Sequence, residues 1–176
     1  RDSSTSRGLG DVYKRQEHFG AMGESAGGFL TCMAALDHDK ARDVGEYLEE
    51  SSSIQAACPW YPPTNLSTFK HKDAEECAAS MESLLLGYNI MRNIKEAYNS
   101  SPVSKVTKDA PPFLIIHGIN DQTVPFEQSE ELYDKLIENG CDADLIALEG
   151  ADHADMQFFQ DELWDRIIDF FKTKLG

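Results

Sequence analysis

The sequence predicts an α/β fold built on a parallel sheet, and three observations lead to that prediction. Short apolar runs alternate with helical patterns from Glu17 onward. Helices placed between strands imply parallel pairing through right-handed crossovers. One run, Phe113–Ile116 (FLII), is apolar at every position, which is typical of a strand buried on both faces. In such sheets the functional groups gather at the carboxyl ends of the strands, so the residues that follow each strand are the informative ones.

The first half of the chain supplies two predicted strands and a helix between them. The run His18–Met22 (HFGAM) predicts a strand that ends at Gly23. Residues Ala26–Leu36 are rich in Ala, Leu and Met, which favours a buried helix. The run Ile54–Cys58 (IQAAC) predicts a second strand, closed by Pro59.

The middle segment, residues 64–109, is polar and interrupted. It carries two helical patterns, Ala74–Leu86 and Met91–Tyr98. This composition is typical of an insertion or cap rather than of a core layer, so we expect a helical, cap-like insertion here.

The last third returns to the alternating pattern after the apolar strand. Residues Phe126–Asn139 predict a helix with Gly140 at the position of a C-cap glycine. The run Leu145–Leu148 (LIAL) predicts the final strand. Gln157–Leu175 has apolar side chains at helical spacing and predicts an amphipathic helix.

The charge of the chain excludes several classes of function. It has 176 residues with a formal net charge of −15, and Asp and Glu (31) outnumber Lys and Arg (16). Nucleic-acid binding needs clustered basic residues, so we expect no nucleic-acid partner. No run of about 18 apolar residues occurs, so we expect no membrane-spanning segment. With 41% hydrophobic residues and nine Phe, the chain is too apolar for a disordered acidic tail.

Four cysteines occur without a C-x-x-C pair: Cys32, Cys58, Cys77 and Cys141. This spacing argues against a zinc or iron–sulfur framework. We interpret them as free thiols packed as small apolar side chains, and expect no bound metal.

Residues 1–16 (RDSSTSRGLGDVYKRQ) differ from the rest in being polar, aperiodic and rich in Ser, Arg and Gly. The segment resembles translated sequencing-adapter read-through at the end of a truncated reading frame; an ordinary disordered extension is the alternative. We therefore expect residues 1–16 to be a non-native or disordered extension, and residues 17–176 to form a partial domain.

A G-x-S-x-G pattern, Gly23-Glu24-Ser25-Ala26-Gly27, follows the first predicted strand and opens the first predicted helix. In this strand–turn–helix context the serine is a candidate nucleophile, Ser25, held in a strained turn. Side chains at positions 23 and 27 are expected to collide with neighbouring elements, which explains both glycines. The N–H of Ala26 at the helix N-terminus is a candidate oxyanion-hole donor. The alternative is a phosphate-binding loop, but the P-loop lysine is absent.

Two later strand-end loops supply an acid and a base. Asp121 follows the strand Phe113–Ile116, and His153 follows the strand Leu145–Leu148. Ser, Asp and His therefore occur in that order on three loops at one edge of the sheet, and this joint occurrence predicts a catalytic triad. Asp152 is a weaker alternative to Asp121 as the acid that orients His153.

Other residues are weaker candidates. Glu24, Trp60 and Tyr61 are predicted to contact substrate, with core packing equally compatible for the two aromatic residues. His117 is interpreted as structural, and His38 as part of a solvated helix end rather than a metal ligand.

The motifs GESAGG, HGINDQTVP and EGADH, in this order, resemble the α/β-hydrolase fold. Within it they are similar to the bifunctional feruloyl/acetyl xylan esterase-like group and the neighbouring prolyl oligopeptidase-type hydrolases. The resemblance covers residues 17–176 and implies Ser25 as nucleophile, Asp121 as acid, His153 as base and Ala26 as an oxyanion donor. It also implies that the chain holds only the C-terminal half to two-thirds of such a domain, because the H-G-G-type loop that supplies the second oxyanion donor lies upstream in that group.

The resulting expectation is a serine hydrolase that cleaves carboxylic esters, such as acetyl or aryl esters of carbohydrates, through an acyl-enzyme and without a cofactor. A peptidase of the prolyl oligopeptidase type and an inactive hydrolase-fold fragment are the alternatives. The sequence leaves the compartment and the oligomeric state open.

Overall fold

Four parallel strands in the order β1-β2-β3-β4 form the centre of the structure. The computed structural model describes residues 18–39 and 44–176, so the prediction for residues 1–16 lies outside the described residues. The strands are β1 (Gly20–Glu24), β2 (Ala56–Trp60), β3 (Phe113–Gly118) and β4 (Ala143–Leu148). All pairings are parallel, with Glu24 opposite Trp60 and Gly118 opposite Leu148. The carboxyl ends of all four strands therefore meet at one edge of the sheet, as the alternating pattern predicts.

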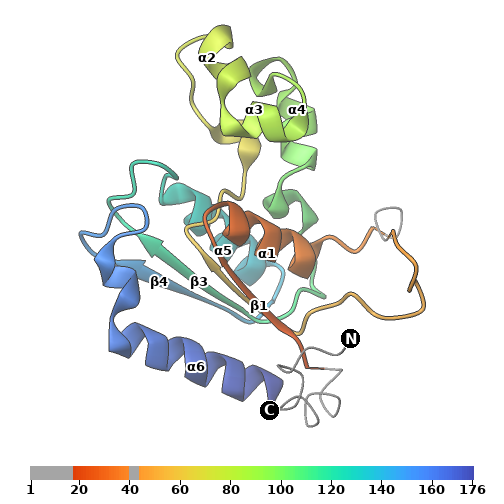
Figure 1. Cartoon of the computed structure of the whole chain (residues 1–176), viewed down its shortest axis with the longest axis vertical. Coiled ribbons are helices and arrows are strands. Elements are labelled where there is room, and N and C mark those ends of the chain that lie inside the picture. Colours follow the sequence, from red (N-terminus) through yellow and green to blue (C-terminus); the bar gives the residue numbers. More distant parts are fainter. Residues whose placement is uncertain (1–17, 40–43) are drawn as a thin grey trace, which may run out of the picture.

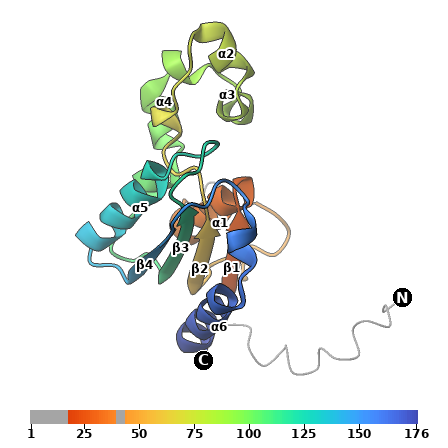
Figure 2. The same ribbon diagram turned by 90° about the vertical axis from the view of Figure 1, so that its left-hand side faces the viewer.

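Helices cover both faces of the sheet (Figures 1 and 2). Helices α1 (Ala26–Leu36) and α5 (Glu127–Glu138) pack on one face, and α6 (Asp161–Leu175) packs on the other. Strand β3 contributes to both cores: Phe113 and Ile115 lie in the core under α1 and α5, whereas Leu114 and Ile116 lie in the core under α6. This two-sided burial is the reason that the β3 sequence is apolar at consecutive positions.

A helical lobe follows β2 and precedes β3, where the sequence predicts an insertion. It contains α2 (Ala74–Ala79), α3 (Met81–Leu86) and α4 (Ile94–Asn99), and it stands apart from the sheet (Figure 2). A small core of Cys77, Ile90 and Ala97 holds it together. Gln128 of α5 ties its first residues to the body of the domain, because its Oε1 accepts the backbone N–H groups of Thr64 (2.9 Å) and Asn65 (2.7 Å).

Several predicted boundaries are wrong by a few residues. Strands β1 and β2 each start and end two residues later than predicted. β2 continues through Pro59 because a proline removes one N–H donor without preventing an extended backbone. The predicted helix Ala74–Leu86 is two helices, since Ser80 ends α2 and its hydroxyl caps α3 by accepting the N–H of Ser83 (3.2 Å). The last predicted helix begins as a 3₁₀ turn, Met156–Phe159, before α6. Further 3₁₀ turns span Leu66–Thr68, Ile90–Arg92 and Pro102–Lys105.

The four cysteines are free thiols, and three of them are fully buried, which confirms their interpretation as small apolar side chains. Burial raises the pKa of the Cys58 thiol to about 12. In the part of the chain that the structure describes, no helix has the length and apolarity needed to cross a bilayer.

Candidate active site

Ser25 occupies the single-residue turn between β1, which ends at Glu24, and α1, which begins at Ala26. Its backbone has φ 52° and ψ −116°, a left-handed conformation that is unusual for a residue with a side chain. The strained turn predicted from the G-x-S-x-G pattern is therefore confirmed. The Ser25 N–H donates to the carbonyl of Trp60 at 3.0 Å, which fixes the turn against the end of β2. Ala26 is the first residue of α1, a position whose N–H has no acceptor within the helix.

The glycines of the elbow differ in whether the structure leaves room for a side chain at their positions. A Cβ at Gly23 would lie 2.4 Å from the carbonyl oxygen of Gly27, so a side chain there collides with the backbone of α1. The same reason was predicted for Gly27 and is wrong, because in the described structure no atom lies within 4 Å of a Cβ at that position. Gly28 is the second constrained glycine, since a Cβ there would lie 2.7 Å from the carbonyl oxygen of Trp60.

Replacing Gly23 by alanine is expected to lower the free energy of unfolding by about 1–3 kcal/mol, because the added methyl group overpacks a contact made by backbone atoms. Gly27→Ala is the matched control. It is expected to leave stability unchanged or to raise it by up to about 1 kcal/mol, because alanine is favoured over glycine inside a helix. Urea unfolding of both variants measures the difference. Equal stability of the two variants would contradict the close approach of β1 and α1.

The structure brings together the three residues predicted as a triad, although they are far apart in sequence. His153 Nε2 lies 3.1 Å from Ser25 Oγ, and His153 Nδ1 lies 2.7 Å from Asp121 Oδ2. The Asp121 side chain is fully buried and that of His153 is 19% exposed. This arrangement places the imidazole between the hydroxyl and the carboxylate, with one ring nitrogen directed at each.

The Asp121 carboxylate is held by the backbone of its own loop. Its Oδ1 accepts the N–H groups of Thr123 and Val124, both at 2.8 Å. Its Oδ2 then faces His153 and also lies 3.3 Å from Nε2 of the buried His117. The Asp121 side chain is therefore fixed on one side by two backbone N–H groups, with its other oxygen directed at His153.

Asp152 does not orient the imidazole. Its Oδ1 accepts the backbone N–H groups of Gln122 (2.9 Å) and His153 (2.7 Å), and these two hydrogen bonds lower its pKa. Asp152 thus braces the loop against the Asp121 loop, while the His153 ring turns to Asp121. The alternative acid considered from the sequence is excluded by this geometry.

His117, interpreted as structural, is fully buried in β3. Its Nε2 lies 2.9 Å from the carbonyl of Val124 and its Nδ1 lies 2.6 Å from the Ser129 hydroxyl. A carbonyl can only accept, so Nε2 carries the proton and Nδ1 accepts from Ser129 in the neutral ring. Burial is the main cause that lowers the pKa of His117, against the opposing effects of Val124 and Asp121.

The lowered pKa of His117 predicts a pH dependence of stability. An unfolded histidine titrates near pH 6.5, so the stabilisation from a neutral buried His117 is present above that pH and is lost as the pH falls below it. We expect the free energy of unfolding to fall below pH 6.5 with a slope that His117→Gln reduces by up to about 1.4 kcal/mol per pH unit. Urea unfolding between pH 5 and 8 measures it. His38→Gln, at an exposed position, should retain the wild-type slope, and an unchanged slope in His117→Gln would contradict the assignment.

The three residues predicted to contact substrate have other contacts in the structure. Trp60 is only 4% exposed and its ring packs against Phe158 and Trp164 in the core under α6. The structure therefore places the Trp60 ring in the core, which is the alternative that the sequence left open for this residue. Tyr61 is 1% exposed, and its hydroxyl donates to Glu24 Oε2 at 2.6 Å. Glu24 is exposed to solvent, and its carboxylate also accepts this hydrogen bond from Tyr61.

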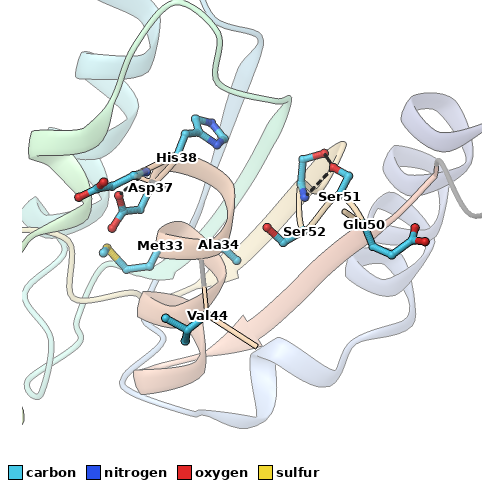
Figure 3. Close-up of a pocket in the computed structure, with 10 residues that line it drawn as sticks. Met33, Ala34, Asp37, His38, Val44, Glu50, Ser51 and Ser52 are labelled. Atoms are coloured by element: carbon cyan, nitrogen blue, oxygen red, sulfur yellow. Dashed lines mark hydrogen bonds between the residues drawn. The ribbon is translucent and has the colours of Figure 1, made fainter. Parts of the chain in front are cut away.

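A cavity of about 570 Å³ lies at the C-terminal end of α1 (Figure 3). It is lined by residues such as Met33, Asp37, Val44 and Ser51. The triad is at the opposite end of α1, so this cavity contributes nothing to it. Among residues 18–39 and 44–176, no group of three or more His, Cys, Asp or Glu side chains is arranged to hold a metal ion.

A serine on a strand–turn–helix elbow, with a histidine and an aspartate on later loops of the same sheet edge, defines the α/β-hydrolase class of proteins. Residues 11–136 match the model of the BD-FAE family, which is more than half of the chain. The chain belongs to the BD-FAE family. The α/β-hydrolase fold and the esterase resemblance read from the sequence are thereby confirmed.

Solved structures and curated relatives agree with that assignment. A truncated carbohydrate esterase from gut microbiota superposes with a TM-score of 0.80 at 26% identity, covering 96% of this chain and 64% of that one. A probable carboxylic ester hydrolase, LipM of Mycobacterium tuberculosis, is 31% identical over 114 residues, 65% of this chain and 26% of the relative. Esterase LipC of the same organism is 29% identical over 133 residues, 74% of this chain and 33% of the relative. The chain thus spans a quarter to a third of the length of these curated relatives.

Proposed function

We propose that the protein hydrolyses carboxylic esters through a serine acyl-enzyme, with Ser25 as nucleophile, His153 as general base and acid, and Asp121 as the orienting acid. The observation that carries the proposal is the continuous hydrogen-bonded chain from Ser25 Oγ to His153 (3.1 Å) and from His153 to Asp121 (2.7 Å). The names of the relatives, which are esterases and carboxylic ester hydrolases, support the reaction class.

The mechanism follows from the position of each group. His153 Nε2 takes the Ser25 proton while Oγ bonds to the ester carbonyl carbon, and the carbonyl oxygen becomes an oxyanion. The N–H of Ala26 is proposed to donate to that oxyanion from the N-terminus of α1. The intermediate collapses, the alcohol leaves with the proton from His153, and Ser25 remains acylated. Water then attacks the acyl group with His153 again as base, which releases the carboxylic acid and restores the serine. No cofactor takes part in these steps.

The substrate class proposed is a small-molecule or carbohydrate ester, such as an acetyl or aryl ester of a sugar. The carbohydrate esterase among the structural neighbours supports this class. The acidic surface of the chain, with its net charge of −15, favours neutral esters over polyanionic substrates.

We further propose that residues 17–176 are one part of a larger α/β-hydrolase domain. In the described residues, β1 is an edge strand. An apolar groove of about 290 Å³ lies beside it, between Met22 and the α6 residues Trp164, Ile168 and Phe171. A preceding strand of a longer protein is the proposed occupant, and the loop after that strand is the proposed source of the second oxyanion donor. Loss of that donor would cost about 3–4 kcal/mol of transition-state stabilisation.

A fluorophosphonate probe tests the reaction, because it forms a covalent bond only with an activated serine. We expect mass spectrometry to find the adduct on Ser25, and the labelled protein to lose aryl-acetate hydrolysis. The test is made on this chain and on one extended upstream by its own coding sequence. Hydrolysis of amide substrates in place of esters would favour the peptidase alternative. Labelling of the extended protein alone would favour the inactive-fragment alternative for this chain, and absence of labelling in both proteins would overturn the proposal.

A further inference from the structure

Tyr61 stands at the centre of the candidate site without touching solvent. It follows β2 directly and has φ 34°, a left-handed conformation for a residue with a bulky side chain. Its backbone N–H donates to the carbonyl of Ile116 at 2.7 Å, which fixes this turn to β3. A non-glycine residue keeps such a backbone only where its surroundings determine it, and these outliers gather at functional sites.

The Tyr61 ring forms one wall of the pocket that holds His153. The two ring centroids are 4.5 Å apart with an interplanar angle of 60°. Behind Tyr61 lies Phe158, whose ring centroid is 4.7 Å away in an edge-on contact. The Tyr61 ring therefore sits between a rigid core residue and the imidazole, and limits the rotation of the latter.

The other end of Tyr61 is tied to the serine elbow. Its hydroxyl donates to Glu24 Oε2 at 2.6 Å, and Glu24 is the residue immediately before Ser25. Burial is the first cause that raises the pKa of the Tyr61 hydroxyl, and the Glu24 carboxylate raises it further. The hydroxyl thus stays protonated as a donor at neutral and moderately alkaline pH.

We propose that Glu24 and Tyr61 form a positioning pair for His153: Glu24 holds the Tyr61 ring, and the ring holds the imidazole with Nε2 directed at Ser25 Oγ. The inference rests on the proposed serine hydrolase function and deepens it. It replaces the prediction that these two residues contact substrate. Neither residue is a catalytic residue, since both act through His153.

Three substitutions separate the parts of this pair. Tyr61→Phe keeps the ring and removes the hydroxyl, Glu24→Ala removes the acceptor, and Glu24→Gln keeps an acceptor oxygen. We expect Tyr61→Phe and Glu24→Ala each to lower the rate constant of the chemical step by about 10- to 100-fold through misplacement of His153, while KM for an aryl acetate stays within about twofold. Glu24→Gln should recover most of the rate. The double variant Glu24→Ala/Tyr61→Phe should lose no more than the worse single variant, because both remove the same hydrogen bond.

Tyr88→Phe is the matched control, because the Tyr88 hydroxyl in the helical lobe is also buried but has no hydrogen-bond partner among the described residues. We expect it to leave the rate unchanged. Additive losses in the double variant, or a rise in KM with an unchanged rate constant, would overturn the proposal and return Glu24 and Tyr61 to substrate contact.

Nitrogen-15 NMR of the imidazole distinguishes failure of this inference from failure of the proposed function. It reports directly which His153 nitrogen is protonated and whether the ring is held. If the fluorophosphonate does not label wild-type Ser25, the proposed function fails. In that case the pair is still supported if the His153 ring becomes mobile in Glu24→Ala and in Tyr61→Phe but not in Tyr88→Phe. His153 signals identical to those of the wild type in the first two variants overturn it.

Discussion

Ser25→Ala is expected to lower turnover of an aryl acetate by about 10⁴- to 10⁶-fold, by comparison with other triads that lose a member. Only the Oγ atom is lost, so no acyl-enzyme can form, and His153 Nε2 loses the group that lies 3.1 Å away. The left-handed backbone at position 25 suits alanine no worse than serine, so the variant should keep the wild-type unfolding free energy.

The matched control for Ser25→Ala is Ser52→Ala, since Ser52 is exposed and lines the cavity at the opposite end of α1. It should retain full turnover and full labelling by the fluorophosphonate. Both variants are measured by steady-state kinetics. They are made in whichever protein hydrolyses the aryl acetate, this chain or the one extended upstream. If Ser25→Ala retains more than a small fraction of the wild-type rate, another residue is the nucleophile and the proposed mechanism is wrong.

The second large effect is expected for Asp121→Asn, with a fall in kcat of about 10⁴-fold. An asparagine can keep the hydrogen bonds from the Thr123 and Val124 N–H groups through its Oδ1. Its Nδ2 then faces His153 Nδ1 as a donor, which moves the imidazole proton to Nε2. That nitrogen points at Ser25 and can no longer accept its proton, so the loop survives while the base is lost.

Asp152→Asn is the control for this tautomer argument, because its Oδ1 also accepts two backbone N–H groups but does not touch the ring. We expect its kcat to remain within a few-fold of the wild type. The stability of both variants by thermal unfolding shows that the loops are intact. A similar loss of kcat in the two variants would contradict the assignment of Asp121 as the orienting acid.

The parts of the site that could be predicted from the sequence are those with local signatures. The G-x-S-x-G string implies its own turn, and the chain order of Ser25, Asp121 and His153 follows from which strand precedes each loop. Because parallel strands end at one edge, this order was enough to predict that the loops meet. The sequence also favoured Asp121 over Asp152 as the acid, but the distances between the side chains depend on the orientation of the imidazole and had no sequence signal.

Packing decides the positions for which the sequence left alternatives open or gave the wrong reason. Trp60 and Tyr61 are adjacent, and alternation along a strand would place them on opposite faces of the sheet. Both lie in the core under α6, because the strand ends at Trp60 and Tyr61 has a left-handed backbone. The roles of Gly27 and Gly28 were exchanged for a similar reason: only the crossing of α1 over the end of β2 decides which glycine faces the Trp60 carbonyl. The motif spacing carries no information on that crossing.

Strand β1 carries the reactive elbow and is also the outermost strand of the sheet in the described residues. Met22 in this strand is 45% exposed, and Phe19 directly before it is 49% exposed. An uncovered, partly apolar strand offers its backbone N–H and C=O groups to any other strand, including the same strand of a second molecule. Among the described residues, the strand that positions Ser25 is therefore also open to edge-to-edge pairing with a second molecule.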